Sequence, residues 1–242
     1  MNKKSSDFFV LKDFYIKVMR VLQKLLSTED IKKQLSYLRS IKKKAIKKAI
    51  ALNLSNCEIP IIPILCSSIR HGMIRAKQIL LIKYIDSDKK ERLGTFELNL
   101  AKVSDTKSES TKHDKHPYFI VGVNLNLSNK GLSPQSVMEK RSSSGNVRFL
   151  TLTEIIALLI QNPQLLEKYT VLACGSEYKN GAKKLVPCIT IRNGVPTITK
   201  VESDKSDSSF ISPTCRERVE VSIINTTSTV IKLRPWKKPN PI

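Results

Sequence analysis

The chain has 242 residues, and 40% of them are hydrophobic, which is enough for a packed core and excludes an intrinsically disordered protein. Lysine and arginine outnumber aspartate and glutamate, giving a formal net charge of +21. A surplus of this size favours polyanionic partners such as RNA, DNA or an anionic membrane surface. A codon bias would explain the large number of lysines better than the excess of cationic over anionic residues, because such a bias should also enrich aspartate and glutamate.

The N-terminal part of the chain predicts a helical hairpin. Residues 7–26 place apolar side chains three and four positions apart, which is typical of one stripe of an amphipathic helix. A serine and a threonine then offer caps for a second helix over residues 29–52. Two acidic residues follow in its first turn, where the helix dipole favours negative charge.

The second predicted helix has a strongly basic side opposite its apolar stripe. After the first turn no acidic residue pairs with these cations, whereas a solvated face normally mixes charges because neighbouring like charges repel. We therefore interpret this side as a phosphate-contacting surface. A plain solvated face and a surface for an anionic membrane or an acidic protein are the alternatives. The cations are Lys32, Lys33, Arg39, Lys43, Lys44, Lys47 and Lys48.

From residue 59 the pattern changes to strands. Short apolar runs bounded by Pro, Ser, Gly and Asp predict strands over 59–65, 78–85, 98–103 and 117–123, the last of them central. Residues 104–116 predict a polar loop. Ser133, followed by a proline, predicts the start of a short helix, and residues 141–146 predict a flexible connector.

The best-specified stretch covers residues 147–176. Thr151 is followed three positions later by Glu154, just ahead of an apolar run, which is a capping-box pattern and predicts a helix that begins at residue 152. Pro163 ends this helix and suits the first turn of a second short one.

The rest of the chain predicts strands and turns. Residues 170–174 form a β-branched run that predicts a buried strand, and Gly175 is interpreted as the turn residue that lets the strand exit. Asn193-Gly194 is a strong hairpin signal, because both central residues of a type I′ turn need positive φ. Strands are predicted on either side of this turn at 185–191 and 195–201, followed by a loop over 202–213 and a last hairpin joining 219–224 to 229–233.

A basic, proline-rich tail ends the chain. Its tryptophan lies between cations, where an indole can stack on a base or fill a partner's pocket, and the prolines keep the segment extended. A disordered tail is the alternative. The candidate contacts here are Arg234, Trp236, Lys237 and Lys238.

No catalytic or metal-binding pattern is well supported. His113 and His116 lie in a charged loop without a second close pair of ligands, and Cys174-Gly175-Ser176 lacks the G-x-S-x-G context of a nucleophile. There is no P-loop and no G-x-G-x-x-G, so no cofactor is predicted. Widely spaced cysteines of odd number predict reduced, buried thiols, namely Cys57, Cys66, Cys174, Cys188 and Cys215.

The N-terminus shows no signal peptide, because charges interrupt its apolar positions, and no apolar run is long enough to cross a bilayer. We therefore expect a cytoplasmic protein, with a non-classically secreted effector as the alternative.

A series of short motifs lies between residues 59 and 218. They are Ile59-Pro60, Pro117-Tyr118, Ser133-Pro134, Leu150-Thr151, Glu154, Ala157, Gln161, Pro163, Leu166, Gly175-Ser176, Val186-Pro187, Gly194, Pro196, Cys215 and Arg218. Their order and spacing resemble a family of uncharacterised bacterial proteins, a domain of unknown function common in actinobacteria. The resemblance implies an α/β domain and no known reaction. The chain departs from the family at Ile191, Thr197 and Thr199, where members carry tryptophans and glycines.

The predicted fold is α/β (α+β): a basic helical hairpin (1–56), a mixed-sheet domain with a capped central helix and a late β-hairpin (57–218), and a C-terminal hairpin with a basic tail (219–242). Our leading hypothesis is a non-enzymatic protein that binds RNA or DNA mainly through phosphates. One alternative is a small-ligand-binding or enzymatic α/β domain centred between the strand at 170–174 and the late hairpin. The other is a protein-interaction or effector protein.

Overall fold

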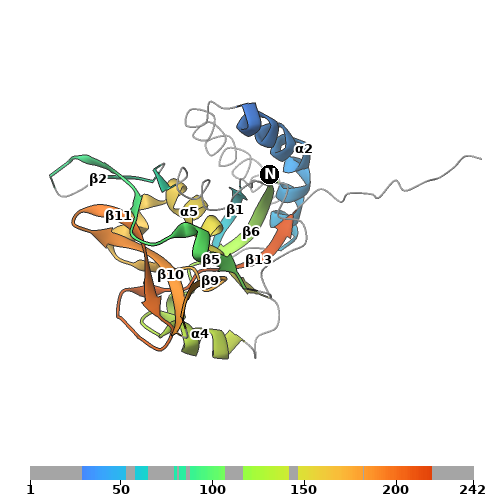
Figure 1. Cartoon of the computed structure of the whole chain (residues 1–242). Helices are drawn as coiled ribbons and strands as arrows, with labels where there is room; N and C mark the ends of the chain where they lie inside the picture. The colour runs from blue at the N-terminus through green and yellow to red at the C-terminus, as the bar shows by residue number, and fades with distance from the viewer. Residues whose placement is uncertain are drawn as a thin grey trace, which may run out of the picture.

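The computed structural model describes residues 29–52, 58–64, 79–80, 82–85, 88–106, 117–141, 147–181 and 183–219. These residues form an α+β fold of helices packed on two main sheets (Figure 1). The predicted first helix, most of the predicted connector, the second strand of the last hairpin and the basic tail lie outside the described residues.

A four-stranded antiparallel sheet has the order β1-β6-β13-β7. Its strands are β1 (Glu58–Ile64), β6 (Tyr118–Asn124), β13 (Thr214–Val219) and β7 (Arg148–Phe149). The prediction of a central strand over 117–123 is confirmed, because β6 is paired on both sides and nearly all of it is buried. The prediction that a strand begins at residue 219 is wrong, since β13 already begins at Thr214, where it pairs with β6, a strand about a hundred residues earlier. Residues 220–224 of the predicted strand lie outside the described part of the chain.

A second sheet has seven strands, with β12-β8-β10-β11-β4 in order and β9 joining β10 to β5. They are β4 (Thr95–Phe96), β5 (Val103–Asp105), β8 (Thr170–Leu172), β9 (Ser176–Asn180), β10 (Lys183–Arg192), β11 (Val195–Glu202) and β12 (Phe210–Ile211). Strands β10 and β11 turn at Asn193 and Gly194, whose φ angles are 50 and 74 degrees. The predicted hairpin is therefore confirmed, with the backbone that a type I′ turn requires.

Three segments have a secondary structure that differs from the predicted one. Among the described residues of the run 78–85, only β2 (Lys83–Ile85) is a strand, and it pairs with β3 (Glu91–Leu93). Half of the piece predicted over 98–103 is a 3-10 helix, η1 (Leu100–Lys102), because the Asn99 side chain accepts a hydrogen bond from the Ala101 N–H and caps a turn. The loop predicted over 202–213 contains β12, which is buried and pairs with β8 in parallel.

Each predicted helix that falls within the described residues is present. Helix α2 (Glu29–Ala51) and α4 (Pro134–Arg141) occupy their expected places. Helix α5 (Leu152–Gln161) begins where the capping box places it, with the box formed by Thr151 and Glu154. The 3-10 helix η3 (Pro163–Glu167) follows α5, and another one, η2 (Leu127–Asn129), precedes α4.

The helices and sheets form layers around the four-stranded sheet. Helix α2 covers one face and contributes to a hydrophobic cluster with β1, β6 and β13 (Figure 1). Helix α5 packs on the opposite side and lies within the largest cluster, which also takes in side chains of β8, β10 and β11 from the second sheet. A smaller cluster joins α4 to the second sheet. The apolar face of each helix therefore determines its place.

Gly175 lies where two segments approach closely. Its N–H donates to the Leu150 carbonyl oxygen at 3.0 Å, and a Cβ at this position would lie 2.8 Å from the carbonyl oxygens of Phe149 and Leu150. Its φ is not positive. The interpretation of Gly175 as a turn residue is confirmed, because it lies in the turn between β8 and β9, which a hydrogen bond from the Ser176 N–H to the Ala173 carbonyl oxygen closes at 2.8 Å. Glycine is needed there because the neighbouring backbone leaves no space for a Cβ.

We expect Gly175→Ala to lower the free energy of unfolding by about 2 kcal/mol, because backbone atoms cannot yield to the added methyl group. The matched control is Gly181→Ala. Gly181 has a φ of +69 degrees but nothing within 4 Å of its Cβ position, so the cost there should be about 1 kcal/mol from backbone strain alone. Urea unfolding measures both. Equal losses in the two variants would contradict the close-approach explanation.

Candidate nucleic-acid interface

The basic side of α2 is exposed because its other side is buried. Its apolar residues face Ile61, Phe119, Val121 and Val219 of the sheet, which turns the opposite side to solvent. The buried residues are Leu35, Leu38, Ile41, Ala45, Ile46 and Ala49. The exposed cations are Lys33, Arg39, Lys43, Lys44, Lys47 and Lys48. Lys32 is part of the helix, but its side chain lies outside the described part.

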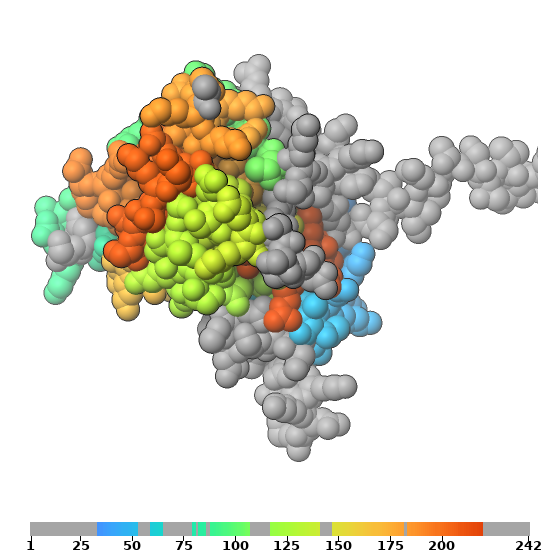
Figure 2. Space-filling model, turned by 90° about the horizontal axis from the view of Figure 1, so that it is seen from below, coloured from blue at the N-terminus to red at the C-terminus, as the bar shows by residue number. Residues whose placement is uncertain are grey.

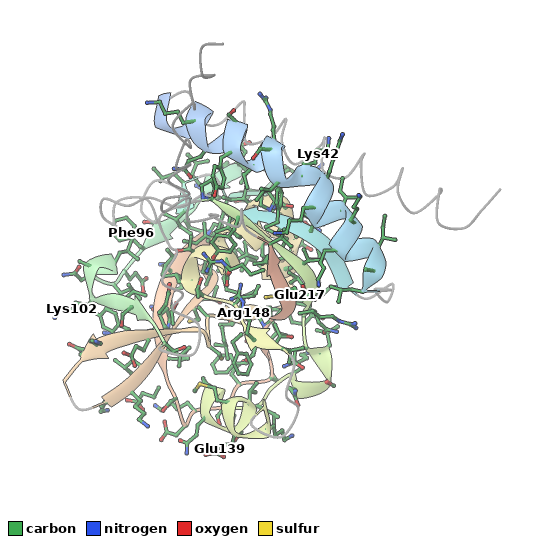
Figure 3. The ribbon with its side chains drawn as sticks, turned by 90° about the vertical axis from the view of Figure 1, so that its right-hand side faces the viewer. Lys42, Phe96, Lys102, Glu139, Arg148 and Glu217 are labelled. Carbon is green, nitrogen blue, oxygen red and sulfur yellow. The ribbon has the colours of Figure 1, made fainter. Side chains whose placement is uncertain are left out.

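The C-terminal half of α2 and the end of β13 enclose a groove of about 590 Å³. Figure 2 shows α2 in blue against β13 in orange-red, and Figure 3 shows Glu217 beside the helix. The groove exists because β7 pairs only with Thr214 and Cys215, so the rest of β13 is a sheet edge among the described strands. The groove is lined by Lys43, Lys44, Lys47, Lys48, Ala51, Glu217, Arg218 and Val219.

Of the eight lining residues that the structure describes, five are cationic and one is acidic. Glu217 Oε2 lies 2.9 Å from Lys48 Nζ, and the two side chains are 33% and 45% exposed. The prediction that no acid pairs with the basic side is therefore wrong at Lys48. The pair is a tertiary contact, and the helix sequence gives no sign of it because the carboxylate lies 169 residues further along the chain.

Arg216 and Arg218 of β13 are held by different contacts. Arg216 Nη1 donates to the carbonyl oxygen of Leu52 at 3.4 Å, at the C-terminal end of α2. Arg218, in the wall of the groove, lies with its guanidinium carbon 3.4 Å from the centre of the Tyr118 ring. A planar guanidinium stacks well on an aromatic face, so Tyr118 restricts the positions that Arg218 can take.

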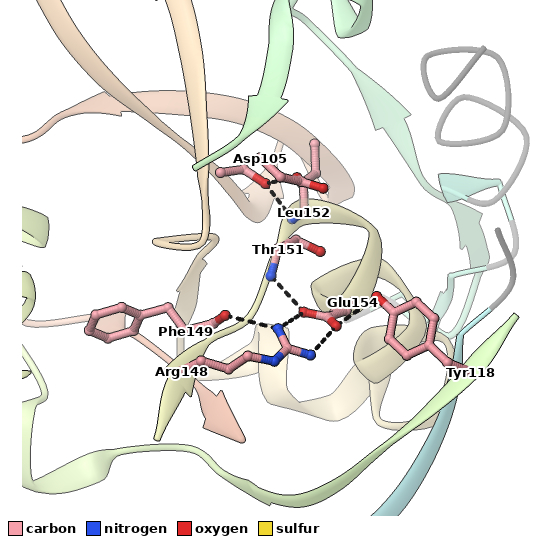
Figure 4. A network of polar contacts seen from close by, with 8 residues as sticks. Asp105, Tyr118, Arg148, Phe149, Thr151, Leu152 and Glu154 are labelled. Atoms are coloured by element: carbon pink, nitrogen blue, oxygen red, sulfur yellow. Dashed lines mark hydrogen bonds and ion pairs between the residues drawn. The ribbon is translucent and has the colours of Figure 1, made fainter. Parts of the chain in front are cut away.

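The hydroxyl of Tyr118 belongs to a buried polar network (Figure 4). It donates to Glu154 Oε1 at 2.7 Å, and Arg148 donates to both oxygens of Glu154, at 2.8 and 2.5 Å. The Thr151 N–H completes the network at 2.9 Å. The Glu154 side chain is fully buried and that of Arg148 is 18% exposed. The carboxylate is satisfied by side chains and backbone from β6, β7 and the start of α5.

Burial by itself raises the pKa of Glu154, but the charge of Arg148 and the hydrogen bonds to the carboxylate outweigh it and hold the pKa below its ordinary value. For Arg148, burial lowers the pKa and the Glu154 carboxylate raises it, with a net rise. Both groups are therefore charged at neutral pH. The sequence pattern identified Glu154 as half of a capping box but gave no sign that Arg148 would bind it.

The surroundings of the cysteines and of Ser176 indicate structural roles for these residues. Cys174, Cys188 and Cys215 are buried and form no disulfide, as predicted. The other two cysteines, Cys57 and Cys66, lie outside the described residues. Burial raises the pKa of Cys174 to about 11 and that of Cys188 to about 12, which keeps both as thiols. The Ser176 hydroxyl donates to Asp105 Oδ1 at 2.7 Å and accepts from the Leu152 N–H at 2.9 Å, so it anchors the start of α5.

Other predicted site residues are not tested in this way. Arg234, Trp236, Lys237 and Lys238, together with His113 and His116, lie outside the described residues. Within the described ranges, no group of three or more His, Cys, Asp or Glu side chains could hold a metal ion. The helices of those ranges include none that is long and apolar enough to cross a membrane.

Comparisons with known proteins do not place the chain. No protein-family model matches its sequence, and neither a curated protein nor a solved structure matches it. The resemblance to uncharacterised bacterial proteins therefore stays a prediction.

We expect Glu154→Gln to lower the free energy of unfolding by about 3 kcal/mol, because it leaves the buried Arg148 charge without its partner. Glu177→Gln is the control. Glu177 is 52% exposed, so its loss should change stability by less than about 0.5 kcal/mol. Urea unfolding at neutral pH measures both. A loss below about 1 kcal/mol for Glu154→Gln would mean that the pair does not hold this part of the fold.

The same network predicts a pH dependence. Since folding lowers the pKa of Glu154, its contribution to stability is full above the pKa of the unfolded chain, and it is lost as the pH falls through the lower, folded value. The unfolding free energy should therefore drop on acidification from about pH 5 to about pH 3, and less steeply in Glu154→Gln. Urea midpoints across this range test it, and parallel curves for the two proteins would contradict it.

Proposed function

We propose that the protein binds nucleic acid through phosphate contacts in the groove between α2 and β13. The observation that carries the proposal is the set of four exposed lysines on one helix, which line a single groove together with the end of β13. Anionic oxygens of a phosphate backbone suit lysine ammonium groups as point charges and arginine as a planar donor. The overall charge of +21 would draw such a ligand toward the protein.

The lining favours binding with little sequence discrimination. Its described residues are Lys, Arg, Ala, Val and Glu, with neither an aromatic ring nor a side-chain amide among them. Stacking on aromatic rings and paired hydrogen bonds from Asn or Gln are common means of reading bases. Contacts to phosphates position a nucleic acid but carry no sequence information. We therefore infer similar affinities for oligonucleotides of different sequence.

A ligand site near the late hairpin has less support. The region between β8 and the β10–β11 hairpin is filled with buried apolar side chains, among them Val171, Leu172, Val186 and Ile189. A pocket for a small polar ligand needs a few converging polar groups. This packing favours the nucleic-acid proposal over an enzymatic or small-ligand site at that place.

Reversing the charge of Lys43, Lys44, Lys47 and Lys48 to Glu should weaken oligonucleotide binding by about 100-fold or more at low salt. The slope of log affinity against log salt concentration should also fall by about 3 to 4, because each lost phosphate contact releases one counterion fewer. Fluorescence anisotropy with labelled RNA and DNA measures both quantities. Circular dichroism shows whether α2 is retained.

The matched control reverses the charge of Lys89, Lys102, Lys168 and Lys184, which are exposed residues outside the groove. This control changes the net charge by the same amount, so its effect on affinity measures the contribution of overall charge alone. We expect it to weaken oligonucleotide binding by less than about 10-fold. Equal losses in the two variants would show that the groove is not the site. Binding to anionic vesicles or an acidic peptide without binding to nucleic acid would contradict the proposal.

A further inference from the structure

We propose that Glu217 is an internal anion that a bound polyanion displaces from Lys48, so that the groove takes chains of phosphates and rejects single ones. This inference rests on the proposed function and names a residue that sets its selectivity. The ion pair lies inside the groove, and both partners line it. A ligand phosphate at Lys48 must therefore replace the carboxylate or lie against it.

Glu217 is held toward α2 by the strand that carries it. Val219, two residues further on the same strand, is buried in the cluster beneath α2, and side chains two apart on a strand face the same way. Arg216 fastens the same strand to the end of α2 through the Leu52 carbonyl. The carboxylate is therefore kept within reach of Lys48 whether or not a ligand is bound.

The ion pair is also weak enough to be exchanged. Its side chains are one third and nearly one half exposed, and ion pairs in such positions contribute little because water and salt screen them. An anion bound elsewhere in the groove can therefore release Lys48 without opening the core.

The tethered carboxylate favours polyanions over single anions. A group held beside its partner by the fold acts at a high effective concentration, so one free phosphate competes poorly for Lys48. A nucleic-acid strand that already contacts Lys43 and Lys47 competes at a comparable effective concentration, since it too is tethered. Neither of these lysines forms an ion pair with a residue that the structure describes. The preference for a polyanion over a single phosphate thus follows from the number of linked charges in the ligand.

The test compares the full-length wild type with Glu217→Gln, using labelled oligo(dT) of about 20 nucleotides in fluorescence anisotropy. We expect the variant to bind about 3- to 10-fold more tightly at low salt, with the salt slope steeper by about 1, because Lys48 then makes a phosphate contact of its own. Inorganic phosphate should compete for the groove more effectively in the variant than in the wild type at equal ionic strength.

Glu202→Gln is the matched control. Glu202 is 32% exposed and lies 2.6 Å from Lys183, so it resembles Glu217 in exposure and pairing but is outside the groove. Its removal should change the affinity less than about twofold. An unchanged or weaker affinity of Glu217→Gln, with a wild type that binds, would overturn the inference and leave the proposed function intact. A wild type and variant that both fail to bind would overturn the proposed function as well.

Discussion

The arrangement of the layers depends on the contacts that the carboxylate of Glu154 makes. This carboxylate accepts hydrogen bonds from Arg148, Tyr118 and the Thr151 backbone, and these groups belong to β7, β6 and the start of α5. A buried ion pair adds little net stability relative to well-packed apolar groups, because both charges lose their water. Its directional hydrogen bonds instead fix where α5 begins relative to the four-stranded sheet, and a nearby apolar contact could not do so with the same geometry.

The network also reaches the groove. The Tyr118 ring, whose hydroxyl is held by Glu154, supports the guanidinium of Arg218 at 3.4 Å. Arg218 in turn lines the groove beside Lys43, Lys44, Lys47 and Lys48. The Tyr118 contact thus restricts a residue of the groove wall, with the Arg218 side chain on the α5 side of the sheet and that of Glu217 on the α2 side, because neighbouring side chains on a strand point to opposite faces.

Sequence reasoning predicted the features that depend on neighbours along the chain. The capping box at Thr151, the type I′ turn at Asn193 and the amphipathic pattern of α2 are local, and each is confirmed. It did not predict features made by distant partners. The pairing of β13 with β6 and the approach of Gly175 to Leu150 join segments whose meeting no local pattern specifies. The basic side of the candidate site was therefore predictable, whereas its second wall and its carboxylate were not.

Helix α2 combines two opposing requirements. Lysines four apart repel each other, as Lys43 and Lys47 do, and Lys44 and Lys48, so the basic side destabilises the helix. The helix persists because its apolar side is buried against β1, β6 and β13, and tertiary packing of this kind supplies most of a helix's stability. Glu217 relieves the repulsion at one lysine when no ligand is bound. A polyanion in the groove would relieve it at all four, so the charge pattern that weakens the free helix is the same one that would make the bound helix more stable.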